Sequence, residues 1–203
     1  MPKGKAITTR MRIVDCAISL YKARGYANVT VHDICSASGL TRSAFYYHFN
    51  SKDEILDDYY LYVEFFIKEH LLPGITSRSY LEQFYDVFNL YLQRTIAAGP
   101  AVLMQILKRG IDVGSSLLSP REISMRKTYL TLIEKAQAAG QIRNQSPASV
   151  LLDSVLYIAN GIALVWCSKQ GKFDMTSEHH RILNTLFMVP SQGYSSWPLR
   201  SEI

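Results

Sequence analysis

The sequence predicts an all-α protein of about nine helices, with a small N-terminal head and a larger C-terminal body. Apolar residues recur at spacings of three and four, and no Asn-Gly or Asp-Gly turn separates alternating runs. Ser/Thr-x-x-Asp/Glu capping boxes, which mark helix starts, recur at Thr30 to Asp33, Ser51 to Glu54, Ser79 to Glu82 and Ser119 to Glu122. Both observations favour helices over strands.

Glycines mark the expected helix ends, at Gly25, Gly39, Gly74, Gly99, Gly140 and Gly171. The predicted helices cover residues 8–24, 31–38, 41–48, 52–72, 79–97, 100–110, 120–139, 147–169 and 177–188. We therefore expect a helix-turn-helix head over residues 1–52, a helical body over 53–190 and a tail over 191–203.

The composition is that of an ordinary folded protein, with 48% hydrophobic and 19% charged residues. The N-terminus lacks the apolar stretch of a secretory signal, so we expect a cytoplasmic protein. The longest uncharged apolar stretch, residues 154–168, is shorter than the ~20 residues of a membrane span and predicts a buried helix. Three scattered cysteines and five scattered histidines suggest neither disulfides nor a metal site, and no cofactor is expected.

The positive charge is concentrated at the N-terminal end. Residues 1–52 carry eight Lys or Arg against Asp15 and Asp33, a net charge of +6 within a chain whose net charge is +5. The remainder is nearly neutral. This asymmetry favours a polyanionic partner such as nucleic acid or an anionic membrane, and a solvated basic face without a partner is the alternative.

Three short helices open the chain in a helix-turn-helix spacing. The apolar stripe of the first helix includes Ile13, Ala17 and Tyr21, and it needs partner helices. The second helix is capped by Thr30. A Gly39-Leu40 turn then leads to a third helix capped by Thr41.

The third helix has one face for a core and others for a groove of DNA. Phe45 and Phe49, four residues apart, are expected in the core of the head. Arg42 suits bidentate contact with guanine, and hydroxyls and Lys suit phosphate oxygens. The next helix opens at Ser51-Lys52, where N–H groups, a helix dipole and a lysine predict a phosphate site. The exposed set comprises Arg42, Ser43, Tyr46, Tyr47 and His48.

At these residues the sequence resembles the tetracycline-repressor (TetR) family of bacterial regulators. The resemblance spans about 45 residues, and the run from Phe45 to Leu56 is especially similar. The matching positions are Ile13, Ala17, Tyr21, Gly25, Thr30, Val31, Ile34, Gly39, Leu40, Thr41, Phe45, Tyr46, His48, Phe49, Ser51, Lys52 and Leu56.

The resemblance implies a DNA-binding transcriptional regulator, by default a repressor, and it assigns roles to residues. Tyr46, His48 and Lys52 would contact phosphates, Thr30 and Thr41 would lie close to the DNA backbone, and Arg42, Ser43 and Tyr47 would face bases. The sequence departs from the family at Cys35 and Ser38, where alanine is usual, and at Ser43, where glycine is common. Because Ser43 lies on the groove side, it affects which bases are preferred.

The body carries an aromatic wall with a few polar tips, which suits a cavity for a small organic effector. A packed core is the alternative interpretation. The candidate ligand-binding residues are Tyr62, Tyr85, Asn89, Gln105, Tyr129 and Asn160.

The last two predicted helices carry more apolar surface than a terminal pair needs to bury alone, and this predicts a homodimer that binds a palindromic operator. The candidate interface residues are Ile158, Ile162, Trp166, Leu183, Leu186 and Phe187. We also expect that the helix over residues 52–72 links head to body, so that an effector beside it changes the separation of two heads.

Two other classes of protein compete with a DNA-binding regulator. An enzyme is disfavoured, because the sequence has no nucleophile elbow, phosphate loop or zinc motif. A peripheral membrane module could use the same basic face, but the first helices need their apolar stripes for one another. We therefore expect double-stranded DNA, not a membrane, as the partner of the head.

Overall fold

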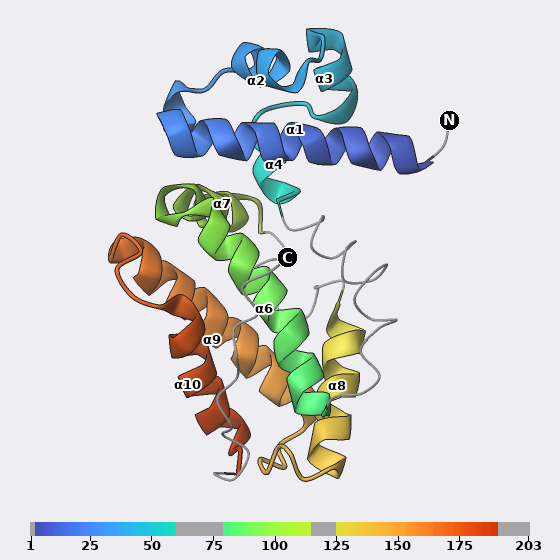
Figure 1. Ribbon diagram of the computed structural model, residues 1–203, viewed down its shortest axis with the longest axis vertical. Coiled ribbons are helices and arrows are strands. Elements are labelled where there is room, and N and C mark those ends of the chain that lie inside the picture. Colours follow the sequence, from blue (N-terminus) through green and yellow to red (C-terminus); the bar gives the residue numbers. More distant parts are fainter. Residues whose placement is uncertain (1–2, 60–78, 115–124, 191–203) are drawn as a thin grey trace.

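The computed structural model describes residues 3–59, 79–114 and 125–190, and every regular element in these ranges is helical. The prediction of an all-α fold is confirmed. Nine α-helices lie in the described ranges, arranged as a head above a helical body (Figure 1). Tyr62, residues 60–72 of the predicted fourth helix and the predicted tail lie outside the described residues.

The head consists of α1 (Lys3–Arg24), a short 3-10 turn η1 (Tyr26–Asn28), α2 (Val31–Ser38) and α3 (Arg42–His48). Helix α1 lies across the base, and α2 and α3 lie on its far side from the body (Figure 1). It begins at Lys3, earlier than the predicted residue 8. Ile13, Ala17, Ile34 and Phe45 form the centre of the head, each fully buried.

Local capping rules explain where α2 and α3 begin and end. Thr30 and Asp33 form a complete capping box, and Thr41 Oγ1 accepts a hydrogen bond from the Ala44 N–H at 3.1 Å. Gly39 ends α2 in the left-handed conformation at φ 64°, where a side chain would be strained. The predicted helix-turn-helix is therefore present with its expected caps.

Helix α4 is short in the described residues, covering Glu54–Asp57, and residues 58 and 59 form a turn. The expectation of an uninterrupted helix from residue 52 is therefore wrong at this point. The predicted capping box is also only half formed. The Glu54 N–H donates to Ser51 Oγ at 3.4 Å, but the Glu54 carboxylate accepts from the backbone and side-chain N–H groups of Asn50 instead.

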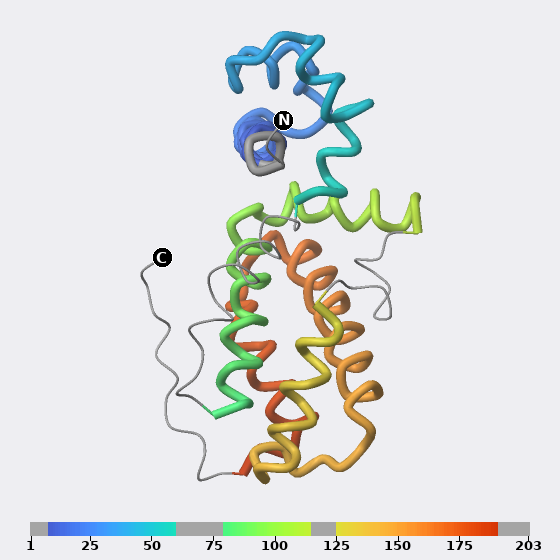
Figure 2. Tube along the Cα trace, turned by 90° about the vertical axis from the view of Figure 1, so that its right-hand side faces the viewer, coloured from blue at the N-terminus to red at the C-terminus, as the bar shows by residue number. Residues whose placement is uncertain are grey.

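The body contains α6 (Tyr80–Ala98), α7 (Pro100–Val113), α8 (Arg126–Ala138), α9 (Ala148–Ser168) and α10 (Met175–Phe187). Helices α6, α8, α9 and α10 run along the body, and α7 lies between it and the head (Figures 1 and 2). Ser79 and Glu82 cap α6 as predicted. Helix α8 is described from Arg126 on, and residues 120–124 of the predicted helix, with the predicted box at Ser119, lie outside the described residues.

Helix α10 begins earlier than predicted, because Asp174 serves as its cap. Its Oδ1 atom accepts from the N–H groups of Thr176 and Ser177 at 2.9 and 3.1 Å. These bonds hold the Asp174 pKa below its usual value, with the Ser177 contacts as the largest cause. The helix therefore starts at Met175 and not at residue 177.

Head and body share a core at their junction. Ala98 at the end of α6, and Val102 and Ile106 on α7, are buried in the same cluster as the head residues. Ile55 and Leu56 from α4 belong to this cluster too. The head therefore rests on the α6–α7 corner through continuous apolar packing.

Candidate nucleic-acid interface

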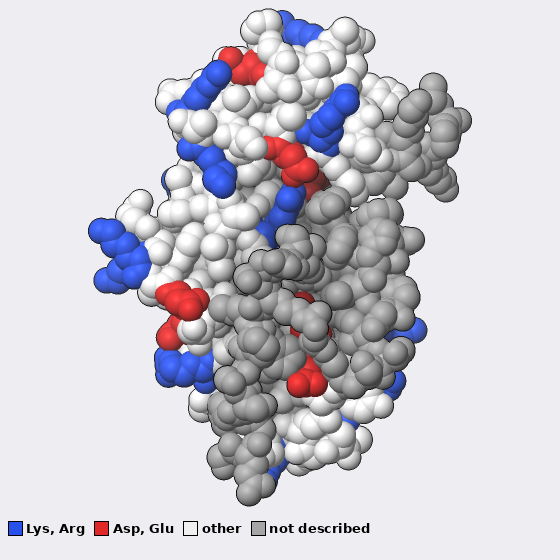
Figure 3. All heavy atoms as spheres, viewed as in Figure 1, with Lys and Arg blue, Asp and Glu red and all other residues white. Residues whose placement is uncertain are grey.

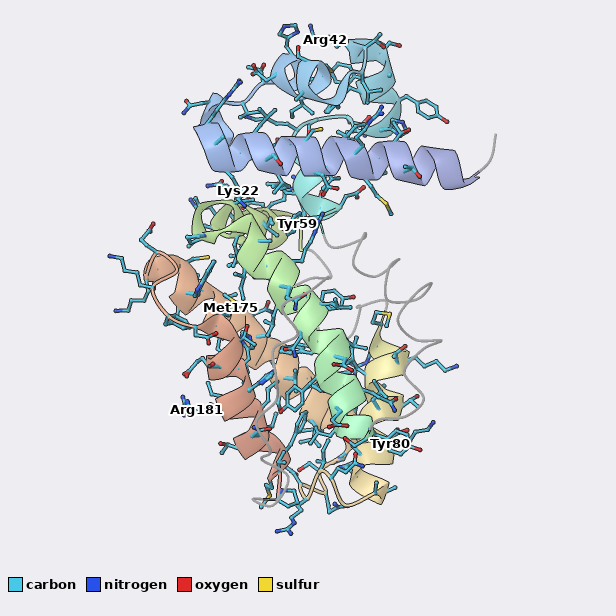
Figure 4. All side chains as sticks on the ribbon, viewed as in Figure 1. Lys22, Arg42, Tyr59, Tyr80, Met175 and Arg181 are labelled. Carbon is cyan, nitrogen blue, oxygen red and sulfur yellow. The ribbon has the colours of Figure 1, made fainter. Side chains whose placement is uncertain are left out.

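Helix α3 separates its side chains between core and solvent as the sequence predicts. Phe45 and Phe49 are 0% and 1% exposed, which confirms their core placement, whereas Tyr46 and Tyr47 are 45% and 81% exposed. Arg42 and Ser43 are exposed beside them. An exposed Tyr next to an exposed Arg, at the end of the head remote from the body, is available to a partner (Figure 4).

The capping threonines differ in how much of their hydroxyl remains available. Thr30 Oγ1 donates to the Asp33 carboxylate and accepts from the Asp33 N–H at 3.2 Å, so both of its hydrogen-bonding functions are used. The Thr30 contacts are the largest cause of the lowered pKa of Asp33. Thr41 accepts from Ala44, and that bond does not use its hydroxyl hydrogen. Of the two, Thr41 can donate to a phosphate oxygen without breaking a cap.

His48 is half-buried at the end of α3. Its ring meets Tyr47 edge to face at a centroid distance of 5.0 Å. Burial lowers the pKa of His48, and the charge of Arg10 lowers it further. At neutral pH the ring is therefore uncharged and can donate one N–H to a phosphate oxygen.

Several basic side chains of the head form hydrogen bonds or ion pairs with other groups of the protein. Arg10 bonds the Asp58 carboxylate and the His48 carbonyl, and its guanidinium lies 4.1 Å from the centre of the Phe49 ring. Arg24 pairs with Asp33 at 3.2 Å, and Lys22 Nζ donates to the Ala97 carbonyl at 2.6 Å. Basic side chains are nevertheless visible over the head (Figure 3).

Lys52 lies on the inner side of the head in the described structure. Its Nζ donates to the carbonyls of Tyr26 and Val29 at 3.0 and 2.9 Å, and it lies 4.4 Å from the centre of the Tyr26 ring. The phosphate contact predicted for Lys52 stays a prediction. No local pattern indicates these carbonyl partners, because Tyr26 and Val29 lie 26 and 23 residues away along the chain.

In the body, Tyr85 and Asn89 on α6 face α10. The Tyr85 hydroxyl donates to Asn184 Oδ1 at 2.7 Å, and Asn89 Oδ1 lies 3.0 Å from His180 Nε2. Tyr129 on α8 is buried against Phe84 at a centroid distance of 5.4 Å, apart from these polar pairs. Gln105 on α7 and Asn160 on α9 are half-buried.

Sequence reasoning missed three polar residues on α10 in this region: His179, His180 and Asn184. His179 is 1% exposed and its Nδ1 lies 2.7 Å from the Met175 carbonyl, whereas its Nε2 has no hydrogen-bond partner among the described residues. No local pattern indicates that His179 and His180 face α6, where His179 meets Phe88 and His180 meets Asn89.

The predicted dimer residues lie mostly inside the single chain. Ile162, Trp166, Leu183 and Phe187 are buried in the body core, so they are not available to a second copy without unfolding, and Ile158 and Leu186 are half-buried. The exposed apolar residues of α9 lie on another face, at Val150, Tyr157, Leu164 and Val165. We call these four residues the α9 face.

By length and composition, α9 could also cross a membrane, and only 39% of its apolar window is buried within the chain. It nevertheless contacts α7, α8 and α10 as one helix of the body. A helix that is apolar on every side hides from sequence analysis which face the chain itself covers. This explains why the predicted interface falls on the inner face.

Known proteins are similar to this chain in two ways: a family model matches the head, and a relative aligns with most of the chain. Residues 13–59 match the family model described as bacterial regulatory proteins, tetR family. A probable acrEF/envCD operon repressor from Escherichia coli is 24% identical over 197 residues, covering 92% of this chain and 89% of the relative.

Solved structures resemble the chain over most of its length. A putative TetR-family transcriptional regulator from Syntrophomonas wolfei aligns with TM-score 0.58 and 20% identity over 89% of this chain and 95% of that one. FadR from Thermus thermophilus, a TetR-family transcriptional repressor solved in complex with lauroyl-CoA, aligns with TM-score 0.56 and 19% identity over 93% and 100%. The matched head segment and the relatives place the protein among DNA-binding regulators and not among enzymes. The head of this chain is thus similar to that of the bacterial regulatory proteins of the tetR family, and the chain as a whole is similar to regulators of that family.

Proposed function

We propose that two copies of this chain bind a palindromic DNA operator in the cytoplasm, repress transcription there and are released by a small organic effector. The observation that carries the DNA-binding part is the exposed surface of α3, where Arg42, Ser43, Tyr46 and Tyr47 lie together. The name of the Escherichia coli relative, an operon repressor, supports repression. Thr30, Thr41 and His48 border the same surface and belong to the proposed contact set.

Arg42 is the residue proposed to read a base, and Tyr47, exposed on the same helix, is proposed as a second base contact. The Arg42 guanidinium lies 5.8 Å from the centre of the Tyr46 ring, one turn further along α3. A bidentate contact of Arg with guanine contributes about 1 to 3 kcal/mol of discrimination between bases. Tyr46 would meanwhile place its hydroxyl near a phosphate.

The proposal of a homodimer rests on the α9 face. Tyr157 and Leu164 are 64% and 54% exposed and lie on one side of the helix with Val150, about two turns apart from one to the next. Gly161 lies in the same stripe, and a Cβ atom there would meet nothing within 4 Å. Apolar surface around a small residue suits close approach of a second helix, and two-fold symmetry would bring the same face of the partner copy against it.

Two heads related in this way would reach two half-sites of a palindrome. Their recognition helices must then be separated by about one helical turn of DNA, ~34 Å, or a multiple of it. A change in that separation would prevent both heads from binding at once, and this is how a ligand in the body could release the operator.

The proposal of an effector rests on the polar groups at the boundary between α6 and α10. Since a carbonyl only accepts, His179 Nδ1 must carry the hydrogen that points to Met175, and Nε2 is then a buried acceptor with no donor within residues 3–59, 79–114 and 125–190. Such a group is costly to leave unsatisfied and suits the hydroxyl or N–H of an uncharged ligand. The centres of the Phe88 and His179 rings lie 5.5 Å apart, with the rings edge to face. An aromatic or other apolar ligand would suit this environment.

Selection of duplexes from random DNA with the purified protein tests the operator part of the proposal. We expect enrichment of an inverted repeat, and loss of that enrichment in Arg42→Ala at matched salt. Selection that returns no inverted repeat would contradict the proposal. Arg143→Ala, which removes an exposed arginine of the body, is the control for net charge and should leave the enrichment intact.

Titration with a phenol and its methyl ether tests the effector part, because the ether lacks the donor. We expect p-butylphenol to raise the melting temperature more than p-butylanisole in the wild type, and the difference to vanish in His179→Leu. A phenol that binds but leaves affinity for the selected duplex unchanged would show a ligand site without a switch. By thermodynamic reciprocity, an effector that weakens DNA binding must itself be weakened equally by DNA.

A further inference from the structure

The side chain and the backbone of Lys52 both form hydrogen bonds with other residues of the head. Its ammonium donates to two carbonyls of the connection between α1 and α2, Tyr26 at 3.0 Å and Val29 at 2.9 Å. Its own carbonyl accepts from the hydroxyl of Tyr21 on α1 at 3.2 Å. The residue that precedes α4 is thus bonded to the end of α1 through its backbone and to the η1 segment through its side chain.

Neighbouring contacts hold the same two segments together. The Tyr26 hydroxyl donates to Asp53 Oδ1, one residue after Lys52, and the Tyr26 ring meets the Tyr21 ring edge to face at 4.8 Å. Burial, followed by the charge of Asp53, raises the pKa of Tyr21 above its ordinary value, so its hydroxyl keeps the hydrogen that it donates to Lys52. The start of α4 and the η1 segment therefore form one bonded unit.

The position of Val29 gives this unit a role in reading DNA. Val29 comes directly before Thr30, the N-cap of α2, and α2 packs against α3. The Lys52 ammonium has three N–H donors, and two of them bond the carbonyls of Tyr26 and Val29. Carbonyls at the end of a helix lack N–H partners within the helix, so a side-chain donor can satisfy them. If the ammonium turned outward to a phosphate, the Val29 carbonyl and the face of the Tyr26 ring would lose this partner, and the Tyr26 carbonyl would be left with the 3.4 Å bond from the Val29 N–H.

We infer that Lys52 is a positioning residue for DNA recognition: it fixes the entry to α2, and through α2 the orientation of α3, instead of contacting a phosphate. This inference rests on the proposed DNA face of α3, and it differs from the phosphate contact that the family resemblance implies for Lys52. The charge of Lys52 stays within the head when DNA binds.

The state of the Lys52 ammonium can be measured directly in the whole protein without DNA. In side-chain ammonium NMR spectra we expect one slowly exchanging lysine signal that disappears in Lys52→Met, because two of its hydrogens are held by carbonyls. Addition of a duplex should leave its position unchanged. A Lys52 signal that exchanges as fast as a solvated lysine, or one that shifts on addition of duplex in step with a phosphorus signal, would overturn the inference.

DNA binding separates a positioning residue from a phosphate contact. A lost phosphate contact weakens specific and scrambled duplexes alike and makes the slope of log affinity against log salt shallower by about 0.9. For Lys52→Met we expect instead an unchanged slope and a ratio of selected to scrambled affinity that falls about tenfold, within the range that one mismatched base pair costs. Uniform weakening with a shallower slope would refute the role.

Two further variants keep this test independent of folding and of the proposed function. Lys22→Met removes another lysine of the head that donates to a carbonyl, at the junction with the body, and should leave the ratio unchanged. Arg42→Met tests the α3 face itself. If Arg42→Met leaves DNA binding intact, the proposed face is wrong, whereas a lowered ratio in Arg42→Met with an unaltered ratio in Lys52→Met contradicts only the role of Lys52.

Discussion

Arg109 on α7 binds the carboxylate of Asp57 on α4 through both oxygens, with its Nε 3.1 and 3.3 Å from Oδ1 and Oδ2 and its Nη2 3.0 Å from Oδ2. A few residues away, the Tyr59 hydroxyl donates to the Arg94 carbonyl of α6 at 2.7 Å, and Arg94 pairs with Asp15 of α1 at 2.8 Å. Polar contacts thus surround the apolar junction of head and body. A displacement of the α6–α7 corner would be transmitted to the head through them.

The Arg109–Asp57 pair should contribute only modestly to stability, because both side chains are about one third exposed. We expect Asp57→Asn and Arg109→Gln to show a coupling free energy of at most about 1 kcal/mol in a double-mutant cycle measured by urea unfolding. Coupling well above that value would show that the pair is more buried in solution. Arg181→Gln, which breaks the exposed pair with Glu178, provides a reference pair on α10.

The two complete capping boxes should stabilise the chain similarly but differ in function. Thr30→Ala and Ser79→Ala each remove a cap bond, at 3.2 Å in both cases, and each should lower the free energy of unfolding by about 0.5 to 2 kcal/mol. Only Thr30→Ala should also weaken DNA binding, since α6 is remote from α3. Equal effects of the two variants on DNA affinity would contradict the placement of the reading surface.

Phe45 and Tyr47 form a matched pair of aromatic residues on the same helix. Phe45→Ala should lower the free energy of unfolding by about 3 to 5 kcal/mol, because the ring is fully buried. Tyr47→Ala should change it by less than about 0.5 kcal/mol and should weaken binding to the selected duplex instead. Chemical unfolding with mobility-shift titration distinguishes the two, and a strongly destabilised Tyr47→Ala would disprove its exposure.

The α9 face and the buried face of α10 should respond differently to a new charge. Leu164→Glu should give a folded monomer, because Leu164 is more than half exposed and lies in the proposed dimer interface. Leu183→Glu should unfold the body, because Leu183 is fully buried and its charge would lack a partner. Sedimentation velocity and circular dichroism report the two outcomes. A dimeric Leu164→Glu protein would exclude this face as the interface.

Stability should decrease below about pH 6.5, the ordinary pKa of histidine. Burial is the largest cause of the lowered pKa values of both His179 and His180 in the folded chain. The unfolded chain therefore takes up protons first, so the stabilisation is complete above the unfolded pKa and is lost as the pH falls toward the folded value.

Urea midpoints measured from pH 7.5 to pH 5 report this loss. The double variant His179→Leu with His180→Gln should have a flatter profile over that interval. Asp174 and Glu178, the carboxylates nearest to these rings, have lowered pKa values and titrate in a more acidic interval. An unchanged slope in the double variant would assign the pH dependence to other groups, such as His48, whose pKa is also lowered by burial.

Local patterns in the sequence were enough to predict most of the described helices, the caps of α2, α3 and α6, and the division of α3 into core and exposed residues. These features depend on neighbours within one or two turns, as between Thr30 and Asp33 or between Phe45 and Phe49. Where the local rules offered two partners, the prediction was less accurate. The Glu54 carboxylate accepts from Asn50 instead of the Ser51 N–H, although the Glu54 N–H does bond Ser51, and Asp174 begins α10 ahead of the predicted start.

The direction in which ambiguous side chains face depends on tertiary packing. Lys52 carries the same charge whether it meets a phosphate or two carbonyls, and those carbonyls are brought to it by the packing of α1 against η1 and α4. Tyr85 and Asn184 are 99 residues apart in the chain. Helix α9 is apolar on almost every side, so periodicity could not distinguish buried Trp166 from exposed Leu164. Contact between distant segments selects one face, and no local pattern encodes that selection.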